Sequence, residues 1–200
     1  MTRLRRYGDA GQAFPIYITV VGGLLFLALA YFAVGQATVN RGGAQTAADA
    51  AALAAAQDAR DQLADEWAAA VLDPTKWQRI FDGDVQLTND PCARAQQLAG
   101  QNEADVLGCY ENGWPLGYKV DVQTRKPMGE SIVPVTAQKR SKANAKAVIE
   151  PLCTFKLPAE GAADDELPRL TCKDKHWDLK PENLTDLPGP QDLFDVHLAD

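Results

Sequence analysis

Charged side chains are absent from 31 consecutive residues near the start of this chain, from Ala10 to Asn40. Surface segments of proteins in water carry charged side chains at short intervals, so this absence excludes an ordinary surface segment. An apolar run of roughly 18 residues or more is long enough to cross a membrane as a helix. The uncharged run therefore points to a membrane-inserted or membrane-exported chain.

Histidine is scarce, and the common catalytic motifs are missing. The chain has two histidines, His176 and His197, and its four cysteines form no CxxC pair, which excludes the usual zinc-site spacings. It contains no P-loop, GxGxxG, HExxH or GxSxG sequence. A serine–histidine–aspartate set needs no closeness in sequence, but both histidines lie in a tail-like region. We therefore expect no catalytic residue, no cofactor and no metal, and a protein that is not an enzyme.

A surplus of basic side chains is also missing. The chain has a net charge of −7 from 20 basic and 27 acidic residues. Residues 1–40 contain three Arg and one Asp, so the remainder holds 17 basic and 26 acidic residues. An acidic domain without a basic stripe is a poor partner for nucleic acid. We expect no nucleic-acid partner.

What the first 40 residues do contain is a predicted transmembrane helix over residues 14–40. Its densest part, Phe14 to Val39, is long enough to span a bilayer even with tilt. Arg3, Arg5 and Arg6 precede it and predict a cytoplasmic N-terminus, because basic residues are retained on that side. The bulk of the chain is then expected outside the cytoplasm, in a single-pass cell-membrane protein.

Two kinds of processing would change this picture. A secretory signal peptide would be cut at a small-x-small site, and Gly35-Gln36-Ala37 fits that pattern. The chain beyond Ala37 would then be released. Alternatively, Gly11 directly before the apolar run has the position of a prepilin cleavage site. A cut between Gly11 and Gln12 would remove the basic leader and keep the helix.

Alanine dominates the next segment, with 14 of the 27 residues from 44 to 70. Good helix formers predict a helix from Ala44 to Leu72, ended by Asp73-Pro74. Gly42-Gly43 is either a hinge or a break after the membrane helix. If the helix continues through it, Phe14 to Leu72 forms a rod of about 88 Å.

Shorter elements follow. Two further helices are predicted, over Thr75 to Phe81 and over Pro91 to Leu107. Alternation of apolar and polar residues predicts strands at Tyr118–Thr124, Ile132–Val135 and Ala143–Glu150, with Asp192–Leu198 either a final strand or mobile. The alanine-lined strand would pack flat on the alanine-rich helix.

These patterns predict an α+β fold: one N-terminal transmembrane helix that continues into an alanine-rich extracytoplasmic helix packed on a small antiparallel β-sheet, tied by disulfides. The expected domains are a basic cytoplasmic leader (1–13), the transmembrane helix (14–40), an extracytoplasmic α+β domain (41–180) and an extended C-terminal tail (181–200).

The four cysteines all follow the membrane run, and an even number in an oxidising compartment indicates two disulfides. Three connectivities are possible. The local one is favoured because each bond then closes a loop of about 15–20 residues, which stabilises by roughly 3 kcal/mol. It pairs Cys92 with Cys109 and Cys153 with Cys172.

Two segments carry a family resemblance. Gly11-Gln12-Ala13-Phe14-Pro15-Ile16-Tyr17 and the alanine-rich stretch from Gln45 to Ala56 resemble TadE/TadG-like proteins of Flp/Tad-type pilus assembly. Such prepilins usually carry Glu at the fifth mature position and Tyr at the sixth. A cut after Gly11 puts Ile16 and Tyr17 there, so the Tyr fits and the Glu is missing, which argues against a major pilin.

The resemblance implies a non-catalytic, membrane-anchored minor pilin, pseudopilin or pilus-assembly factor, and the alanine-rich character suggests an actinobacterial source. Its expected partners are the membrane and other pilus or Tad secretion-system components, with a homo- or hetero-oligomer formed through the N-terminal helix. The alternative is a secreted or single-pass cell-surface binding module released by signal peptidase near Ala37.

Overall fold

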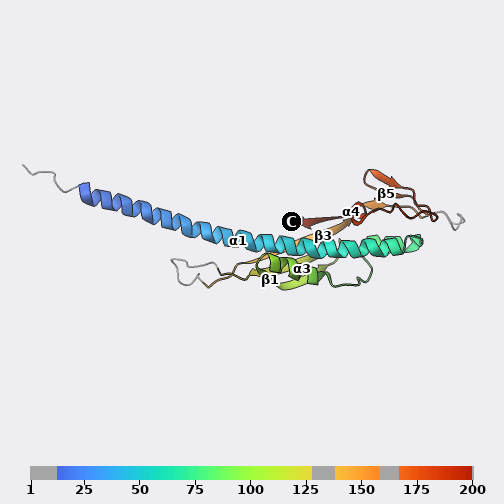
Figure 1. Cartoon of the computed structure of the whole chain (residues 1–200), viewed down its shortest axis with the longest axis horizontal. Helices are drawn as coiled ribbons and strands as arrows, with labels where there is room; N and C mark the ends of the chain where they lie inside the picture. The colour runs from blue at the N-terminus through green and yellow to red at the C-terminus, as the bar shows by residue number, and fades with distance from the viewer. Residues whose placement is uncertain (1–12, 128–137, 158–166, 200) are drawn as a thin grey trace, which may run out of the picture.

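One long helix runs through the whole molecule. The structure is a computed structural model that describes residues 13–127, 138–157 and 167–199. Its first element, α1 (Ala13–Ala69), has 57 residues and is about 86 Å long. Figure 1 shows α1 as the longest feature of the fold, with every other element gathered around its second part. Gly42-Gly43 lies inside α1, so of the two alternatives for this pair the continuous helix is the observed one.

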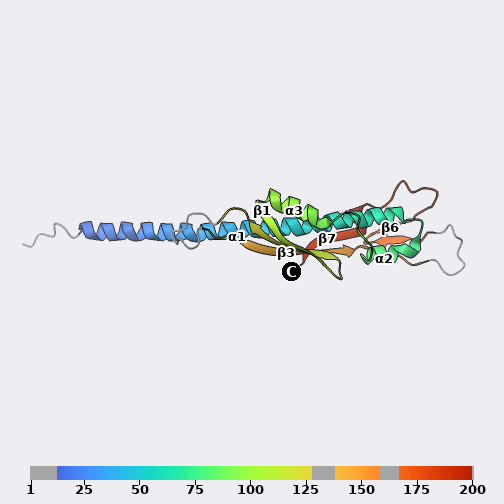
Figure 2. The same ribbon diagram turned by 90° about the horizontal axis from the view of Figure 1, so that it is seen from below.

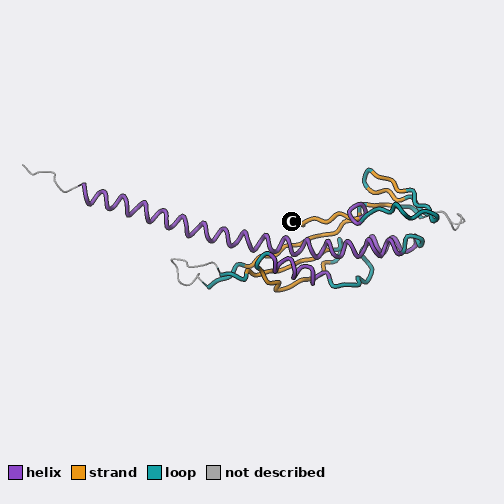
Figure 3. Tube along the Cα trace, viewed as in Figure 1, coloured by secondary structure: helices purple, strands orange, loops and turns teal. Residues whose placement is uncertain are grey.

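The remaining elements are short and lie along the second part of α1. They are η1 (Pro74–Lys76), α2 (Trp77–Phe81), α3 (Pro91–Gln101), β1 (Ala104–Asn112), β2 (Gly117–Thr124), β3 (Lys142–Pro151), β4 (Cys153–Thr154), β5 (Leu170–Cys172), β6 (Lys175–Trp177), α4 (Pro190–Leu193) and β7 (Phe194–Ala199). Figure 3 shows that the strands all lie beside this part of the helix.

Burial divides α1 into two halves. In residues 14–43, which we call the exposed half, every described side chain is exposed except that of Val21, which is half-buried. Burial begins at Ala44, and residues 44–69, the packed half, lie inside the head, our name for the described residues from 44 onward. Ala51, Ala52, Ala54, Ala55 and Ala56 are buried at 6% exposure or less, and Leu53 between them is half-buried. A helix contacted on nearly all sides has room for little more than methyl groups, which explains its composition.

The main sheet has four antiparallel strands in the order β1-β2-β3-β7. The packed half of α1 lies against β2, β3 and β7, and α3 lies between α1 and β1. Figure 2 shows α1 and α3 on one side of these strands. Residues Ala143, Ala145 and Ala147 of β3 stand opposite Val122, Val120 and Tyr118 of β2. The predicted alanine-lined strand against the alanine-rich helix is therefore confirmed.

One glycine in the sheet is required by a close backbone approach. A Cβ placed on Gly117, at the start of β2, would lie 2.3 Å from the carbonyl oxygen of Ala147. Any other residue here would push β2 away from β3, because real Cβ atoms do not come so close to an oxygen. Residues 113–116 form the turn that precedes this glycine and joins β1 to β2.

A second sheet, β4-β5-β6, closes the end of the head farthest from the exposed half of α1. Aromatic rings join it to the helix at this end. Trp67 of α1 lies 5.4 Å from Trp77 of α2, which lies 5.2 Å from Phe155 after β4. Phe81 continues the contact to Phe155 and to Phe194 of β7, at 5.9 and 5.5 Å between ring centres. We call this end of the head the distal end. The aromatic contacts pack it against the last turns of α1.

The helix predicted over Pro91 to Leu107 is wrong in its second part. The chain leaves α3 at Gln101, and Ala104 to Leu107 belong to β1. Asn102 caps the helix, and Glu103 has a φ of 55°, a left-handed conformation that ends a helix. The helix predicted at Thr75 to Phe81 is confirmed, with its first turn a 3₁₀ helix.

The end of the described chain docks on the sheet. Of the two alternatives for Asp192–Leu198, a final strand is observed: β7 pairs with β3, and Phe194 is 1% exposed. Residues 194–199 are thus part of the main sheet and depart from the extended tail expected for 181–200. The strand predicted at Ile132–Val135 lies outside the described residues. The domain boundaries themselves stay a prediction.

Candidate functional site

The exposed half of α1 is the most unusual surface of the molecule. Twelve of its Phe, Ile, Leu and Val side chains are more than half exposed: Phe14, Ile16, Ile18, Val20, Leu24, Leu25, Phe26, Leu27, Leu29, Phe32, Val34 and Val39. Burying this many such side chains is worth on the order of 20 kcal/mol. A surface of this kind marks a membrane or protein contact, since monomeric proteins in water rarely expose so much apolar area.

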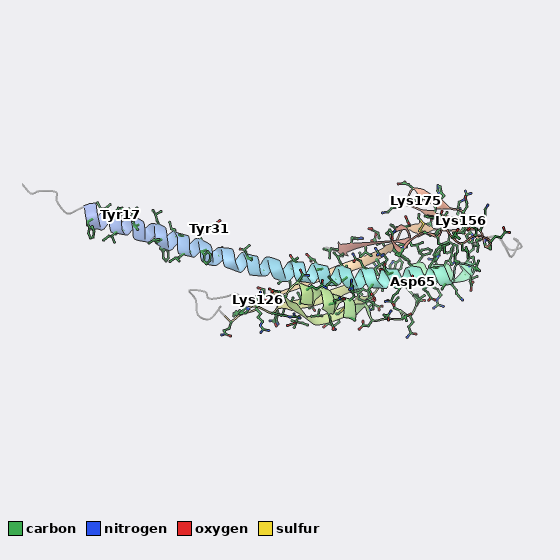
Figure 4. The ribbon with its side chains drawn as sticks, in the orientation of Figure 1. Tyr17, Tyr31, Asp65, Lys126, Lys156 and Lys175 are labelled. Carbon is green, nitrogen blue, oxygen red and sulfur yellow. A yellow bond between two sulfur atoms is a disulfide. The ribbon has the colours of Figure 1, made fainter. Side chains whose placement is uncertain are left out.

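The dimensions of this half fit a bilayer. Phe14 to Phe32, 19 residues with none of the segment buried, is long and apolar enough to cross a membrane by length and composition. Its length is about 28 Å, close to the roughly 30 Å of a hydrocarbon core. Tyr17 and Tyr31 lie near its two ends, as Figure 4 shows, and tyrosine is favoured where a helix meets the headgroups.

The two threonine hydroxyls in the exposed half of α1 are satisfied by the helix itself. The hydroxyl of Thr19 donates to the carbonyl oxygens of Pro15 and Ile16, at 3.1 and 2.8 Å. The hydroxyl of Thr38 donates to the carbonyl of Val34 at 3.1 Å. Both threonine hydroxyls are therefore hydrogen-bonded. A segment surrounded by lipid needs this, because no water is there to bond its polar groups.

Small residues interrupt the bulky ones in this half. A Cβ added at Gly22, Gly23 or Gly35 would meet nothing within 4 Å. Nothing in the chain itself therefore requires glycine at these positions, although glycine weakens a helix by about 1 kcal/mol relative to alanine. Glycines on membrane helices let a second helix approach closely.

The residues predicted for prepilin-type cleavage, Gly11 and Gln12, lie outside the described residues. The first described residue, Ala13, already belongs to α1 and lies two residues after Gly11. Ile16 and Tyr17, the fifth and sixth positions after that cut, lie in its first turns and are 63% and 69% exposed. Gly35-Gln36-Ala37, the alternative site, lies well inside the helix.

The two disulfides have the predicted local connectivity. Cys92 in the first turn of α3 is bonded to Cys109 of β1, with their Cα atoms 5.9 Å apart. Cys153 of β4 is bonded to Cys172 of β5, directly opposite it in the ladder, with a Cα separation of 4.0 Å. The bonds close loops with sequence separations of 17 and 19, each worth about 3 kcal/mol.

Displaced pKa values occur where the fold is held together. Hydrogen bonding from Lys175, at 2.9 Å, lowers the pKa of the Asp192 carboxyl, and the Gly189 amide donates to its other oxygen at 3.1 Å. Burial raises the pKa of the Tyr118 hydroxyl, with the nearby Glu111 carboxylate adding to the effect. An ionised carboxylate and a neutral phenol are both poor general bases near neutral pH. Their role is structural.

The two histidines lie on different sheets. His176 of β6 has its Nδ1 atom 3.3 Å from the Thr171 hydroxyl, and His197 of β7 lies 3.3 Å from a carboxylate oxygen of Asp195. Within the part of the chain that the structure describes, no group of three or more His, Cys, Asp or Glu side chains could hold a metal ion.

A hollow of about 510 Å³ lies near β5 and β6. The charged side chains Arg169 and Asp178 line it, and they pair with each other at 2.6 Å. Both are about two-thirds exposed, so water screens them and their charges offset each other. The hollow offers no activated group.

These features define a class of protein: a head domain carried on a single N-terminal helix with an unpartnered apolar half. Residues 11–58 match the family model described as "Putative Flp pilus-assembly TadE/G-like". The matched segment covers the exposed half of α1 and the start of its packed half, the region on which the sequence resemblance rests, so that resemblance is confirmed. The comparison with curated proteins and the comparison with solved structures found no match.

Proposed function

We propose that the chain is a non-catalytic, membrane-anchored component of Tad/Flp-type pilus assembly, a minor pilin or an assembly factor. One observation carries this proposal. A single continuous helix has an unpartnered apolar half and a half buried in a disulfide-tied head. This is the layout of a subunit that holds its place by a helix and makes its contacts with a head. The match over residues 11–58 supports the pilus-related role.

In the proposed topology, the N-terminus is cytoplasmic and the head is extracytoplasmic. Arg3, Arg5 and Arg6 support it, because basic residues next to a membrane helix stay on the cytoplasmic side. The two disulfides support it independently, since such bonds persist in oxidising compartments and are rare in the cytoplasm.

Two modes of assembly are open to this helix. If the leader is cut after Gly11, the mature chain begins within two residues of the first helical residue, Ala13. The apolar half could then pass from the bilayer into a bundle of similar helices. If the leader is kept, Arg3 to Arg6 hold the helix in the membrane as an anchor. Gly22, Gly23 and Gly35 are in both cases the proposed contact points for a helix of a second copy or of another pilus component.

The released binding module is less well supported. A peptidase that binds its substrate in an extended conformation would have to unwind α1 around Gly35-Gln36-Ala37, which is helical. The cut would also remove most of the apolar surface, so this surface would have no use in the mature protein.

The test is the mass of the mature N-terminal peptide, taken from membranes, sheared filaments and medium of the native host. A start at Gln12 in the membrane or filament fraction would support a processed pilin-like subunit. A start at Met1 or Thr2 in membranes would support an anchored assembly factor. A start near Thr38 in the medium would refute both forms.

A substitution pair separates processing from insertion. Gly11→Leu is expected to block removal of the leader, so that a larger mature mass appears while the chain still enters the membrane. Gly8→Leu changes a glycine three residues upstream, inside the leader. The leader should still be removed, so the mass of the mature chain should equal that of the wild type. If the Gly11 and Gly8 variants give the same N-terminus, prepilin-type processing of this chain is refuted.

A further inference from the structure

Basic side chains gather at the end of the head nearest the exposed half of α1. They are Arg41, Arg125, Lys126, Lys139, Arg140 and Lys142, and all six are exposed. We call this group the basic collar. It comes from three parts of the chain that lie far apart in the sequence: α1, the end of β2 and the start of β3. The strand pairing brings the last two together, since the Thr124 amide donates to the Ser141 carbonyl at 2.9 Å.

Carboxylates offset only part of this charge. Arg125 pairs with Asp105 at 2.7 Å, and Lys126 pairs with Glu103 at 2.7 Å. Among the residues that the structure describes, no carboxylate lies within ion-pair distance of the other four members of the basic collar. The collar therefore carries a net positive charge on a domain that is acidic as a whole.

The acidic surplus lies elsewhere on the head. Exposed or half-exposed carboxylates follow one another along the later turns of α1, at Asp58, Asp61, Asp65 and Glu66. Figure 4 shows Asp65 toward the distal end and Lys126 at the opposite end of the head, nearest the exposed half. The four carboxylates of α1 and the basic collar thus lie toward opposite ends of the head, although Lys156 and Lys175 also lie toward the distal end, as Figure 4 shows. A net charge alone could not reveal this separation.

The level of the basic collar along α1 follows from one contact. The side-chain amide of Gln45 donates to the Asn144 carbonyl of β3, at 3.4 Å, and sets β3 level with this turn of the helix. Lys142 lies two residues nearer the exposed half, about 7 Å at the rise of a strand. That distance equals four to five helical residues, so Lys142 lies about level with Arg41. Lys126 lies at the same end of the head, nearest the exposed half of α1, as Figure 4 shows.

This level coincides with the surface of the bilayer that α1 would span. The apolar segment ends at Phe32, and the headgroup layer extends about 5–8 Å beyond the hydrocarbon core. Arg41 lies nine residues, or about 14 Å, beyond Phe32. The level of Arg41 and Lys142 therefore lies about 6–9 Å outside the headgroups, a distance comparable to the Debye length of about 8 Å at physiological salt.

We propose that the basic collar binds the phosphate groups of anionic phospholipids at the surface of the membrane in which α1 is anchored. This inference rests on the membrane anchoring in the proposed function and adds a second contact with the bilayer. The contact fixes how the head sits on the membrane: the basic collar faces the lipids, and the acidic distal end points away from a surface of its own sign. Each Lys or Arg near an anionic surface adds to the binding free energy, so the four collar side chains without an ion pair bind together as one patch.

The experiment uses the full chain, held as a single copy in a lipid disc. Gln138, an exposed neighbour of the basic collar, is replaced by Cys and carries a nitroxide spin label. The four native cysteines are bonded to one another, so the new thiol alone reacts. Collisions of the label with a neutral nickel chelate in the water report its distance from the lipid. Discs of phosphatidylcholine are compared with discs that also contain phosphatidylglycerol.

The proposal expects the label to be shielded from the chelate in the anionic discs and accessible in the zwitterionic ones. Shielding should disappear in 1 M NaCl, where the Debye length is about 3 Å. In the triple variant K139Q/R140Q/K142Q, the ratio of docked to undocked heads should fall roughly 100-fold, about fivefold for each lost charge. The matched variant R94Q/K156Q/K180Q removes one Arg and two Lys from exposed positions outside the collar and should keep the shielding.

Other results overturn the proposal. Equal accessibility in both kinds of disc, or shielding that salt does not change, would refute binding to anionic lipid. Shielding that requires two copies in a disc and is independent of lipid charge would assign the basic collar to the acidic end of a second head. A second label at Leu25 tests the anchor itself. If that label is out of contact with lipid, the proposed function fails; if it is embedded while the Gln138 label is indifferent to lipid charge, this inference alone fails.

Discussion

Replacing Ala55 with Leu should destabilise the head, although leucine is the more apolar residue. Ala55 lies in the packed half of α1 and has no exposed surface, and its buried neighbours are themselves mostly alanine. A leucine adds three carbon atoms. If there were space for them, the gain would be about 0.8 kcal/mol for each, or roughly 2 kcal/mol of added stability. In a filled interior the same atoms cost about 1–3 kcal/mol.

The sign of the change therefore tests the packing. We expect a loss of about 2 kcal/mol, which lowers the midpoint of thermal unfolding by roughly 4–8 °C for a domain of this size. The full chain in mild detergent can be unfolded by heat while tryptophan fluorescence is recorded, because Trp67 and Trp77 are fully buried in the head.

Ala28→Leu is the matched control, since Ala28 lies in the exposed half of the same helix. It should leave the unfolding of the head unchanged. An Ala55→Leu chain that is as stable as the wild type, or more stable, would refute the close packing of α1 in the head.

Three further predictions concern the head. Gly117→Ala should destabilise it by about 1–3 kcal/mol, because the new Cβ meets the Ala147 carbonyl, whereas Gly113→Ala, where a Cβ meets nothing within 4 Å, should be nearly neutral in the same melt. Reducing both disulfides should cost about 6 kcal/mol in total; equal urea midpoints with and without reductant would contradict their stabilising role. The pKa of Asp192 is lower in the folded state than in the unfolded chain. The ion pair of Asp192 therefore stabilises the head fully above the pKa of the unfolded chain, about pH 4, and this stabilisation is lost as the pH falls through the lower pKa of the folded state. The difference in melting temperature between wild type and Asp192→Asn should thus be present at pH 7 and shrink below pH 4, and a difference that is independent of pH would contradict it.

The helix and the disulfides could be predicted because their signals are local. An uncharged apolar run, an alanine-rich run and a proline stop are each visible in a single stretch of sequence. They left open whether Gly42-Gly43 interrupts the helix, and the structure has one continuous α1. Both cysteine pairs close short loops, and the structure has that connectivity. The alanine-lined strand β3 was recognisable by its alternation, which persists even though its inward side chains are only methyl groups.

The errors arise where distant contacts decide the structure. Ala104 and Val106 have acceptable helix propensity, yet they form a strand because β1 pairs with β2 and is bonded to α3 through Cys109. The second sheet has strands of two and three residues, too short to show a period. The basic run from Lys139 to Lys142 is visible in the sequence, but only the register of β3 against α1 places it level with Arg41.

The alanine-rich packed half of α1 has a consequence for how the head folds. It precedes all seven strands in the chain, yet it lies in the middle of the core, and its contact from Gln45 to Asn144 spans 99 residues. A helix of this composition gains little from burial before a partner surface exists. Loop closure over such separations makes folding slow, and the apolar inner face of the sheet is exposed in the meantime. We therefore expect the rate of head formation to be set by the docking of β2, β3 and β7, and a helix fixed at one end in the bilayer, as proposed above, would hold in place the surface on which these strands dock.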